Sequence, residues 1–277
     1  MRSSFNVANP ASWLKSTLSV ACLSAGLFMT QAASATTVQF QTVLGDFEVN
    51  LFDKTTPKTV ANFLAYVNAE AYKNTIVHRS VKDFVIQGGG YKFNGELPLT
   101  AVAQNAAVEN EPVYSNLRGT IAMAKLAGNP NSATNQWFIN LNDKNATDKS
   151  HGFVLDTNNG GFSVFGQVMG EGMVVVDAIA ALNRFNVGIF EGFPLRDYSA
   201  ADQVANKPVT GNNLVLIENI VVLNADPDTA SSLNPAKNTL INQKEDKKDG
   251  GSGSLGLFSL LALALVALGR KSMLNKG

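Results

Sequence analysis

The chain has 277 residues, of which 45% are hydrophobic and 16% are charged, and its formal net charge is zero. Without the five basic residues near the two ends, 17 basic and 22 acidic residues remain, a net charge of −5 for the middle of the chain. Nucleic-acid binding needs a cationic face, so this composition argues against that function. The length allows one large domain or two small ones.

Residues 1–35 are predicted to be a secretory signal peptide. Lys15 precedes an apolar stretch at residues 18–29, and an Ala-Ser-Ala sequence that ends at Ala35 follows as a small-x-small cleavage pattern. A buried N-terminal helix is the alternative. Because the one cysteine, Cys22, lies inside this segment, we expect a mature protein without disulfides in an oxidising compartment.

Residues 36–225 are predicted to form a single domain that begins with a β-hairpin and a helix. Apolar and polar residues alternate over residues 38–42 and again over 47–51, with a Gly-Asp turn between the two runs. Thr56 and Pro57 predict the start of a helix, with threonine as N-cap and proline at the first helical position. Apolar residues that follow at i, i+3, i+4 and i+7 predict its buried face: Val60, Phe63, Leu64 and Val67.

The rest of the domain is rich in short β-type segments. They are predicted at residues 76–79, 83–87, 119–124, 136–140 and 162–168, with a closing strand over 214–223. A second helix is predicted around residues 172–183, and the residues of its buried face are Val175, Ala178, Ile179 and Leu182. Many short strands with two well-separated helices indicate a mainly β barrel or sandwich and argue against a parallel α/β sheet.

The C-terminal part is predicted to be a linker followed by a tail. Residues 226–249 are polar and charged, which is typical of a flexible, solvated spacer. Residues 250–277 contain a Gly-Gly-Ser sequence, an uncharged apolar run at 255–268 and a basic end. The run is shorter than the roughly 20 residues that cross a bilayer comfortably, and a buried core helix is the alternative. By the positive-inside rule the basic end stays cytoplasmic and the main domain lies outside.

Two segments of the domain carry the candidate site. Residues 77–90 place a permanent cation, Arg79, an amide, Gln87, and a large apolar ring, Phe84, on short extended segments that end in glycines, and residues 136–140 add an apolar strand with polar flanks. Neither segment contains a nucleophile with a base, a carboxylate pair or a metal-ligand cluster. The pair therefore predicts a site that binds and orients a substrate, and with two histidines in the chain we expect no metal and no cofactor.

Five motifs follow one another within residues 37–224. They are His78-Arg79, Phe84-Val85-Ile86-Gln87-Gly88-Gly89, Arg118-Gly119-Thr120-Ile121-Ala122-Met123-Ala124, Gln136-Trp137-Phe138-Ile139-Asn140 and Phe162-Ser163-Val164-Phe165-Gly166. With these motifs in this order, the segment resembles a cyclophilin-type peptidyl-prolyl isomerase of the exported bacterial kind. The resemblance implies a mainly β fold, an eight-stranded antiparallel barrel capped by two α-helices. It also implies that the chain is a monomer that isomerises X–Pro bonds in unfolded or flexible polypeptides.

The resemblance also implies roles for individual residues. The implied catalytic residues are Arg79, Phe84, Gln87 and Phe138. The implied substrate-binding residues are His78, Val85, Ala124, Lys125, Gln136, Leu155 and Phe162. In this scheme Arg79 points at the proline nitrogen and Gln87 orients Arg79. Phe84, Val85, Phe138 and Leu155 form the pocket for the proline ring, Ala124 and Lys125 lie along the peptide groove, and Gln136 and His78 support it.

Some positions depart from the family pattern. Lys125 stands where the family usually has Asn, and Phe162 where many relatives have His or Tyr. Val154 replaces an aromatic residue of drug-sensitive relatives, so we expect weak cyclosporin binding. Two segments, 141–161 and 185–213, are longer than in compact relatives, and the second forms either an extra lobe over the groove or a partner surface.

The tail resembles the GlyGly-CTERM sorting tails of some exported bacterial proteins. It implies a periplasmic domain that is anchored to the inner membrane by residues 250–277, or released to the cell surface once the tail is cut. Two other functions stay open. The same groove could serve a non-catalytic binding module that holds a proline-containing partner, although binding alone does not require the cation. A surface structural protein would account for the tail and for none of the groove residues.

Overall fold

The computed structural model describes residues 36–149, 154–224 and 233–243. The expected signal peptide and the expected sorting tail lie outside these residues, as does most of the expected linker. Within the described part, no helix is long and apolar enough to cross a membrane.

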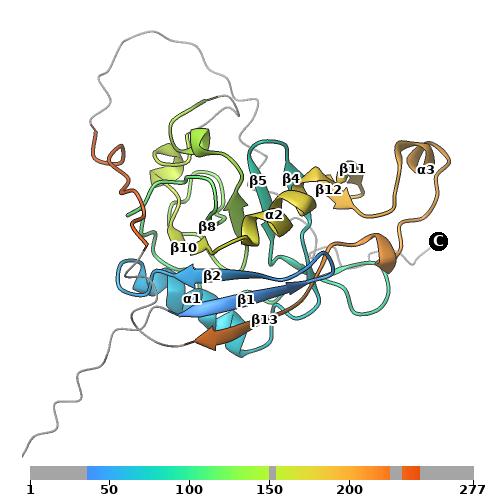
Figure 1. Ribbon diagram of the computed structural model, residues 1–277, viewed down its shortest axis with the longest axis horizontal. Helices are drawn as coiled ribbons and strands as arrows, with labels where there is room; N and C mark the ends of the chain where they lie inside the picture. Colours follow the sequence, from blue (N-terminus) through green and yellow to red (C-terminus); the bar gives the residue numbers. More distant parts are fainter. Residues whose placement is uncertain (1–35, 150–153, 225–232, 244–277) are drawn as a thin grey trace, which may run out of the picture. The chain divides into compact units, whose positions relative to one another are not determined.

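The domain is built on one antiparallel sheet of eleven strands in the described part of the chain (Figure 1). In spatial order the strands are β4 (Arg79–Val81), β5 (Val85–Gly88), β9 (Trp137–Asn140), β8 (Thr120–Met123), β10 (Val164–Val168), β2 (Phe47–Leu51), β1 (Thr37–Thr42), β13 (Leu216–Asn224), β3 (Thr75–Ile76), β6 (Tyr91–Lys92) and β7 (Thr100–Ala101). The last long strand, β13, pairs with the first, β1, so the two ends of the domain meet inside the sheet. The short helical elements are η1 (Asp143–Ala146), η2 (Asn158–Gly160) and η3 (Gly211–Asn213).

The predicted mainly β, antiparallel architecture is confirmed, but the predicted number of eight strands is not. The three extra strands, β3, β6 and β7, have two residues each. A two-residue strand is too short to show an alternating pattern, so the sequence does not reveal it. The described chain also holds a third α-helix, α3 (Ala200–Val204), and a separate hairpin of β11 (Asn183–Val187) and β12 (Phe190–Leu195).

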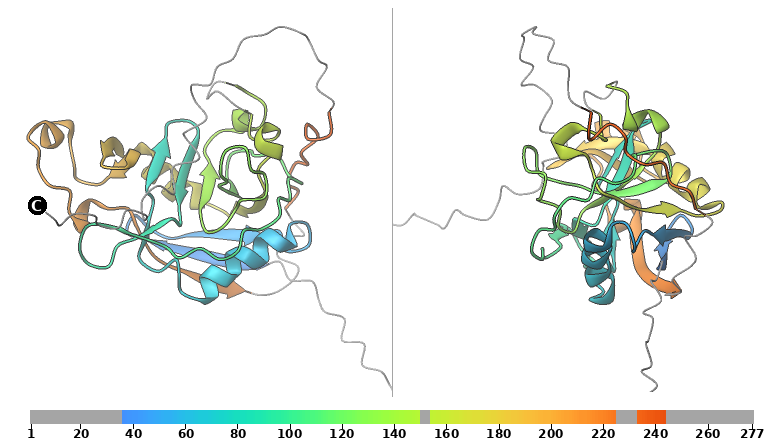
Figure 2. Two further views of the ribbon diagram at one scale, coloured as in Figure 1. Left: turned by 180° about the vertical axis from the view of Figure 1, so that it is seen from behind. Right: turned by 90° about the vertical axis from the view of Figure 1, so that its left-hand side faces the viewer.

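The first helix, α1 (Pro57–Asn68), begins where Thr56 and Pro57 predict it. Val60, Phe63 and Val67 of its predicted face are buried, and Figure 2 shows the helix lying along β13. The predicted cap is different, because the hydroxyl of Thr56 donates backwards to the carbonyl of Phe52 at 3.2 Å. A distant carboxylate takes its place: the amide of Thr59 donates to Glu111 at 2.8 Å. An anion at a helix N-terminus also interacts favourably with the helix dipole.

The second helix, α2 (Gly172–Ala181), has a buried face that differs from the predicted one. Val176 and Ile179 are buried, whereas Ala178 is exposed and Val175 is half-buried. Three consecutive valines at 174–176 fit several helical registers equally well, so periodicity alone does not choose between them. The helix packs against β2 and β5.

Alternation along β9 separates two apolar clusters on opposite faces of the sheet. Trp137 and Ile139 belong to the main core, together with Phe63 of α1, whereas Phe138 between them belongs to a second cluster. Successive side chains of a strand point to opposite faces, so one strand contributes to both. In the main core the ring of Phe63 lies 5.1 Å from that of Phe165 and 5.3 Å from that of Tyr72, between centroids.

The hairpin β11–β12 belongs to the long segment 185–213 and lies beside β4. Phe185 and Phe193 form a third apolar cluster with Ile76. Gly192 has a φ of +65°, and a Cβ atom at this position would lie only 2.7 Å from the carbonyl oxygen of Ser80. The close approach brings strand β12 of the hairpin to β4, the strand that carries Arg79.

Residues 233–243, which fall within the expected linker, run alongside the domain and are called the strap below. The strap is the red segment of Figure 1. Tyr114 and Lys237 form an antiparallel bridge, and the amide of Ser115 donates to the carbonyl of Ala236 at 2.9 Å. The amide of Asn238 donates to the carbonyl of Val113, also at 2.9 Å. This part of the chain therefore has defined contacts with the domain.

We predict that Phe63→Ala lowers the free energy of unfolding by about 3–5 kcal/mol, because it removes a ring from the centre of the main core and leaves a cavity. Urea unfolding of the purified protein measures the change. Val174→Ala, at a valine that is 63% exposed on α2, is the matched control and should change stability by less than about 0.5 kcal/mol. Equal losses for the two variants would contradict the assignment of Phe63 to the core.

Candidate active site

Strand register brings the predicted polar and apolar site residues into one row. Arg79 on β4 lies opposite Gln87 on β5, and Gln87 lies opposite Phe138 on β9. The row continues from Phe138 to Ala122 on β8. Directly opposite residues of antiparallel strands place their side chains next to one another on the same face of the sheet. Residues more than forty positions apart in the sequence are thus neighbours.

The side chain of Arg79 is oriented by a chain of amide groups. Its guanidinium Nη1 donates to Oε1 of Gln87 at 3.4 Å, and Nε2 of Gln87 donates to Oε1 of Gln136 at 2.8 Å. Burial lowers the pKa of Arg79, and the negative charge of Glu191 on β12 acts in the opposite direction. An arginine stays protonated under such conditions, so the group is a permanent donor that is partly removed from water.

The apolar residues of the predicted proline pocket form the second cluster. Phe84, Val85, Phe138 and Leu155 belong to it, and so does Phe162. The rings of Phe138 and Phe162 meet edge to face at 5.7 Å between centroids. Phe138 and Leu155 are fully buried at 0% exposure, so both are packed inside the cluster. The structure therefore brings the four predicted pocket residues together in one apolar region.

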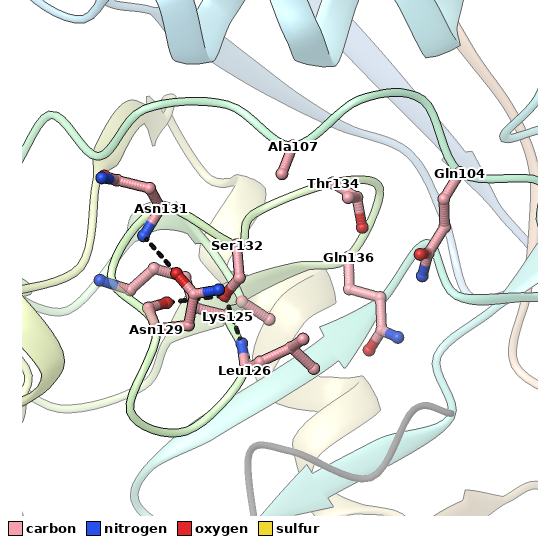
Figure 3. Close-up of a pocket in the computed structure, with 10 residues that line it drawn as sticks. Gln104, Ala107, Lys125, Leu126, Asn129, Asn131, Ser132, Thr134 and Gln136 are labelled. Atoms are coloured by element: carbon pink, nitrogen blue, oxygen red, sulfur yellow. Dashed lines mark hydrogen bonds between the residues drawn. The ribbon is translucent and has the colours of Figure 1, made fainter. Parts of the chain in front are cut away.

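A cavity of about 260 Å³ opens beside this cluster (Figure 3). Three predicted residues line it, namely Ala124, Lys125 and Gln136. The sequence interpretation missed the other lining residues, which are Gln104, Ala107, Leu126, Asn129, Asn131, Ser132 and Thr134. Five of these seven belong to a run of turn-forming and polar residues over 126–134 that follows Ala124 and Lys125 directly, which is their sequence signal; Gln104 and Ala107 lie outside that run. Gln136 lines the cavity and also bonds Gln87, so it connects the cavity to the guanidinium.

The loop that lines this cavity is held by its own hydrogen bonds. The amide of Leu126 donates to Oγ of Ser132 at 2.7 Å, and the hydroxyl of Ser132 donates to the carbonyl of Asn129 at 2.7 Å, as Figure 3 shows. These hydrogen bonds within the chain hold the wall of the cavity in place. A pre-formed cleft loses less entropy when a peptide binds.

Comparisons with known proteins match this architecture. Residues 37–196 match the family described as cyclophilin type peptidyl-prolyl cis-trans isomerase/CLD. The chain belongs to this family. It is 38% identical over 178 residues to a peptidyl-prolyl cis-trans isomerase of Acinetobacter baylyi, covering 63% of this chain and 88% of the relative. It is 37% identical over 162 residues to peptidyl-prolyl cis-trans isomerase B of Escherichia coli, covering 58% and 93%.

A solved structure gives a further comparison. The crystal structure of a Cryptosporidium parvum cyclophilin type peptidyl-prolyl cis-trans isomerase aligns with a TM-score of 0.48 and 22% sequence identity, covering 69% of this chain and 98% of that chain. The family match covers more than half of this chain, and it makes this protein a cyclophilin-type peptidyl-prolyl cis-trans isomerase, an enzyme of the isomerase class.

Lys125 is the most unusual residue of this cyclophilin site. It is 3% exposed, and its Nζ donates to the carbonyls of Asn159 at 2.8 Å and Gly161 at 2.5 Å. Nζ also lies 4.6 Å from the centroid of the Phe162 ring, a cation–π distance. Burial lowers the pKa of Lys125 to about 7, and the two carbonyls and the ring favour the charged form and oppose that shift. Lys125 thus ties strand β8 to the loop that leads from Leu155 to Phe162.

His78 is buried next to Arg79 in an aromatic setting. Its ring lies 5.2 Å from that of Tyr91 and 6.4 Å from that of Phe190, between centroids. Burial, followed by the positive charge of Arg79, lowers the pKa of His78 to about 3. The imidazole is therefore neutral at ordinary pH. This places it among the packing groups behind Arg79 and gives no support for acid–base chemistry by His78.

Asn145 is a site-supporting residue that the sequence interpretation missed. Its buried side chain donates to the carbonyl of Phe84 at 2.7 Å. Its backbone carbonyl accepts a hydrogen bond from the amide of Leu155 at 2.9 Å. One residue thus holds two walls of the apolar cluster at a fixed separation. No sequence signal marks it, because it lies in the polar segment after Asn140 among other turn-forming residues.

We predict that Lys125 makes stability depend on pH. In the folded protein its pKa is about 7, against an ordinary value near 10.5, so between these values the unfolded chain binds the extra proton. The contribution of Lys125 to the unfolding free energy then rises with pH from about 7 to about 10 and is lowest below pH 7. Urea unfolding from pH 6 to pH 10 should show this rise in the wild type, and Lys125→Gln should lose it.

The matched control is Lys54→Gln, at an exposed lysine. Its unfolding free energy should follow the wild type in parallel across the same pH range. If Lys125→Gln also runs parallel to the wild type, the amine does not titrate in that window and the prediction is wrong.

Proposed function

We propose that this cyclophilin accelerates X–Pro isomerisation in exported proteins by non-covalent stabilisation of a twisted amide, with Arg79 as the hydrogen-bond donor. The observation that carries the proposal is the row of Arg79, Gln87 and Phe138 across three strands. It sets a permanent cation beside an apolar cluster. A binding module for a fixed partner, the rival function, would not need a cation that is kept partly out of water.

The chemistry of the reaction fits this arrangement. Rotation about a peptide bond faces a barrier of about 18–20 kcal/mol, because nitrogen shares its lone pair with the carbonyl group. For X–Pro bonds the two isomers differ by only about 0.5–1 kcal/mol, so the rate is slow although the equilibrium is balanced. In the twisted form the nitrogen becomes pyramidal and accepts a hydrogen bond. A donor that cannot lose its proton, such as Arg79, stabilises that form.

The rate acceleration of the isomerisation requires more than one hydrogen bond. A rate gain of roughly 10⁵ corresponds to about 7 kcal/mol of preferential binding of the transition state. One charge-assisted hydrogen bond contributes about 1.5–3 kcal/mol. The remainder is assigned to the apolar walls, Phe84, Val85, Phe138 and Leu155, which hold the proline ring, and to the cavity at Ala124, Lys125 and Gln136, which takes the flanking peptide backbone.

The proposed substrates are proline-containing, unfolded or flexible polypeptides, handled by a monomer without cofactor. The net charge of −5 in the middle of the chain supports a protein substrate and no nucleic acid. The proposed location is the periplasm, with the tail at residues 250–277 holding the domain at the inner membrane or being removed. The support for this location is the sequence pattern of the two ends.

We predict that Arg79→Ala lowers kcat/KM for a short Pro peptide by about 10- to 150-fold, the equivalent of one charge-assisted hydrogen bond. A protease-coupled isomerisation assay at low temperature measures the rate. Arg184→Ala removes an exposed arginine of the hairpin and should keep wild-type activity. If the wild type and Arg79→Ala are equally slow, the catalytic role of Arg79 fails and the binding-module function gains support.

We also predict weak inhibition by cyclosporin, because Val154 offers no aromatic surface next to Leu155. Inhibition of the same isomerisation reaction, titrated with the drug beside a drug-sensitive cyclophilin, measures the affinity. Inhibition as tight as in the sensitive enzyme would show that the aromatic residue is dispensable here.

The proposed location has its own test. Mass spectrometry of the protein purified from its native membrane and periplasmic fractions should find an N-terminus at Thr36 and a C-terminus either at Gly277 or near the glycines at 250–251. Recovery of a chain that retains Met1 from those fractions would argue against signal-peptide cleavage.

A further inference from the structure

We propose that the strap, residues 233–243, positions the active site: Asn238 and Ile241 hold the loop 155–162 so that Leu155 and Phe162 stay in the wall of the proline pocket. The inference rests on the proposed site, because it assigns a further role to the pocket wall described there. The strap lies beyond residues 37–196, the part that matches the family.

Asn238 makes the central contact. It is 7% exposed, and its Nδ2 donates to the carbonyl of Asp156 at 2.7 Å. Asp156 directly follows Leu155 and is itself 1% exposed. A buried carbonyl without a donor costs about 1–3 kcal/mol, so Asn238 satisfies a group that the loop cannot leave unpaired.

The strap is itself folded around Asn238. Oδ1 of Asn238 accepts the amides of Leu240 at 3.0 Å and Ile241 at 3.1 Å, which turns the chain back towards the loop. Ile241 then reaches Gly161: a Cβ atom at Gly161 would lie 3.2 Å from Cδ1 of Ile241. The strap therefore touches the loop near both of its ends, beside Leu155 and beside Phe162.

The loop contains little regular structure and is held by individual hydrogen bonds, of which the strap supplies one. The segment 155–162 includes only the single turn η2, and Asn159 inside it has a φ of +54°. Other anchors lie within the loop and on the inner side of the domain. The amide of Phe162 donates to the carbonyl of Leu155 at 3.0 Å, and the amide of Leu155 donates to the backbone carbonyl of Asn145. Side chains that donate to the loop are those of Lys125, to the carbonyls of Asn159 and Gly161, of Asn116, to Oδ1 of Asp156, and of Asn110, to the carbonyls of Gly160 and Gly161. Asn238 and Ile241 act from the outer side of the same loop, and the strap is in turn bonded to residues 113–115.

The test uses the full chain and the variant Asn238→Asp. Aspartate keeps the size of asparagine and the oxygen that accepts the amides of Leu240 and Ile241, but it replaces the donor to Asp156 by a carboxylate oxygen. Thr239→Asp adds the same charge one residue away, on an exposed side chain, and is the matched control. Asn238→Asp should lower kcat/KM for a Pro peptide about 5- to 30-fold, and Thr239→Asp should stay within about two-fold of the wild type.

Hydrogen exchange separates positioning from general destabilisation. The amides of Leu155 and Phe162, which donate to Asn145 and Leu155 respectively, should exchange faster in Asn238→Asp. Amides that bond β1 to β13 should keep their wild-type rates. Wild-type activity and exchange in Asn238→Asp would overturn the proposal. So would equally faster exchange at β1 and β13, because the strap would then stabilise the whole domain and not the pocket wall.

The two proposals fail in different ways. If the wild type does not isomerise Pro peptides, the proposed function is wrong, and the exchange rates of Leu155 and Phe162 still decide whether the strap holds the loop. If the wild type is active and Arg79→Ala is slow, but Asn238→Asp matches Thr239→Asp, the site stands and the role of the strap is refuted.

Discussion

The proposed site depends on the guanidinium of Arg79, which is kept partly out of water with an amide oxygen as its hydrogen-bond partner. Among the described residues, no carboxylate lies within ion-pair distance of Arg79, although Glu191 acts on it from farther away. A carboxylate in direct contact would take up the donors of the guanidinium in a bidentate pair. Gln87 orients the group with a single contact at 3.4 Å, so the remaining N–H groups of Arg79 are available to a substrate.

The sheet explains how such a group is held still. Arg79 and Gln87 belong to paired strands, and β9 beside them has the main core on one face and the pocket cluster on the other. Packing on both faces restricts β9 more than packing on one face would. A site whose residues stand on packed strands keeps its geometry better than a site on free loops. Because Phe138 is fully buried in the second cluster, it has both the burial of a core residue and the position of a residue of the proposed proline pocket.

Local signals in the sequence predicted most helices and strands, but they did not predict contacts between residues far apart in the sequence. The start of α1 was predicted correctly because the preference of proline for the first helical position is local, although the side chain of Thr56 does not cap the helix. The carboxylate that caps this helix, Glu111, lies more than fifty residues away and has no local signature. The face of α2 was predicted in part: Ile179 is buried, and Val175 and Leu182 pack against the core. Ala178 is exposed and Val176 is buried, since three consecutive valines leave the choice to tertiary packing.

The site shows the same division. Arg79, Phe84, Gln87 and Phe138 stand in motifs whose order along the chain marks them, and strand register then brings Arg79, Gln87 and Phe138 into one row. Asn145 and Asn238 carry no such mark, because an asparagine in a polar segment looks the same whether its amide faces water or a buried carbonyl. Side-chain to backbone contacts of this kind depend on where a distant loop lies, which the sequence pattern does not encode.

The extent of the folded unit follows from the same contacts. The family match ends at residue 196, yet β13 at Leu216–Asn224 is an inner strand between β1 and β3, so the sheet is incomplete without it. The strap extends the unit further, because the carbonyl of Asp156 is buried and has its donor in Asn238. A chain ending after β13 would keep the strands of the sheet but lose the donor that the strap supplies to that carbonyl. The sheet therefore extends the folded unit to Asn224, the last residue of β13. The hydrogen bond between Asn238 and the loop 155–162 extends the proposed support of the active site to the strap.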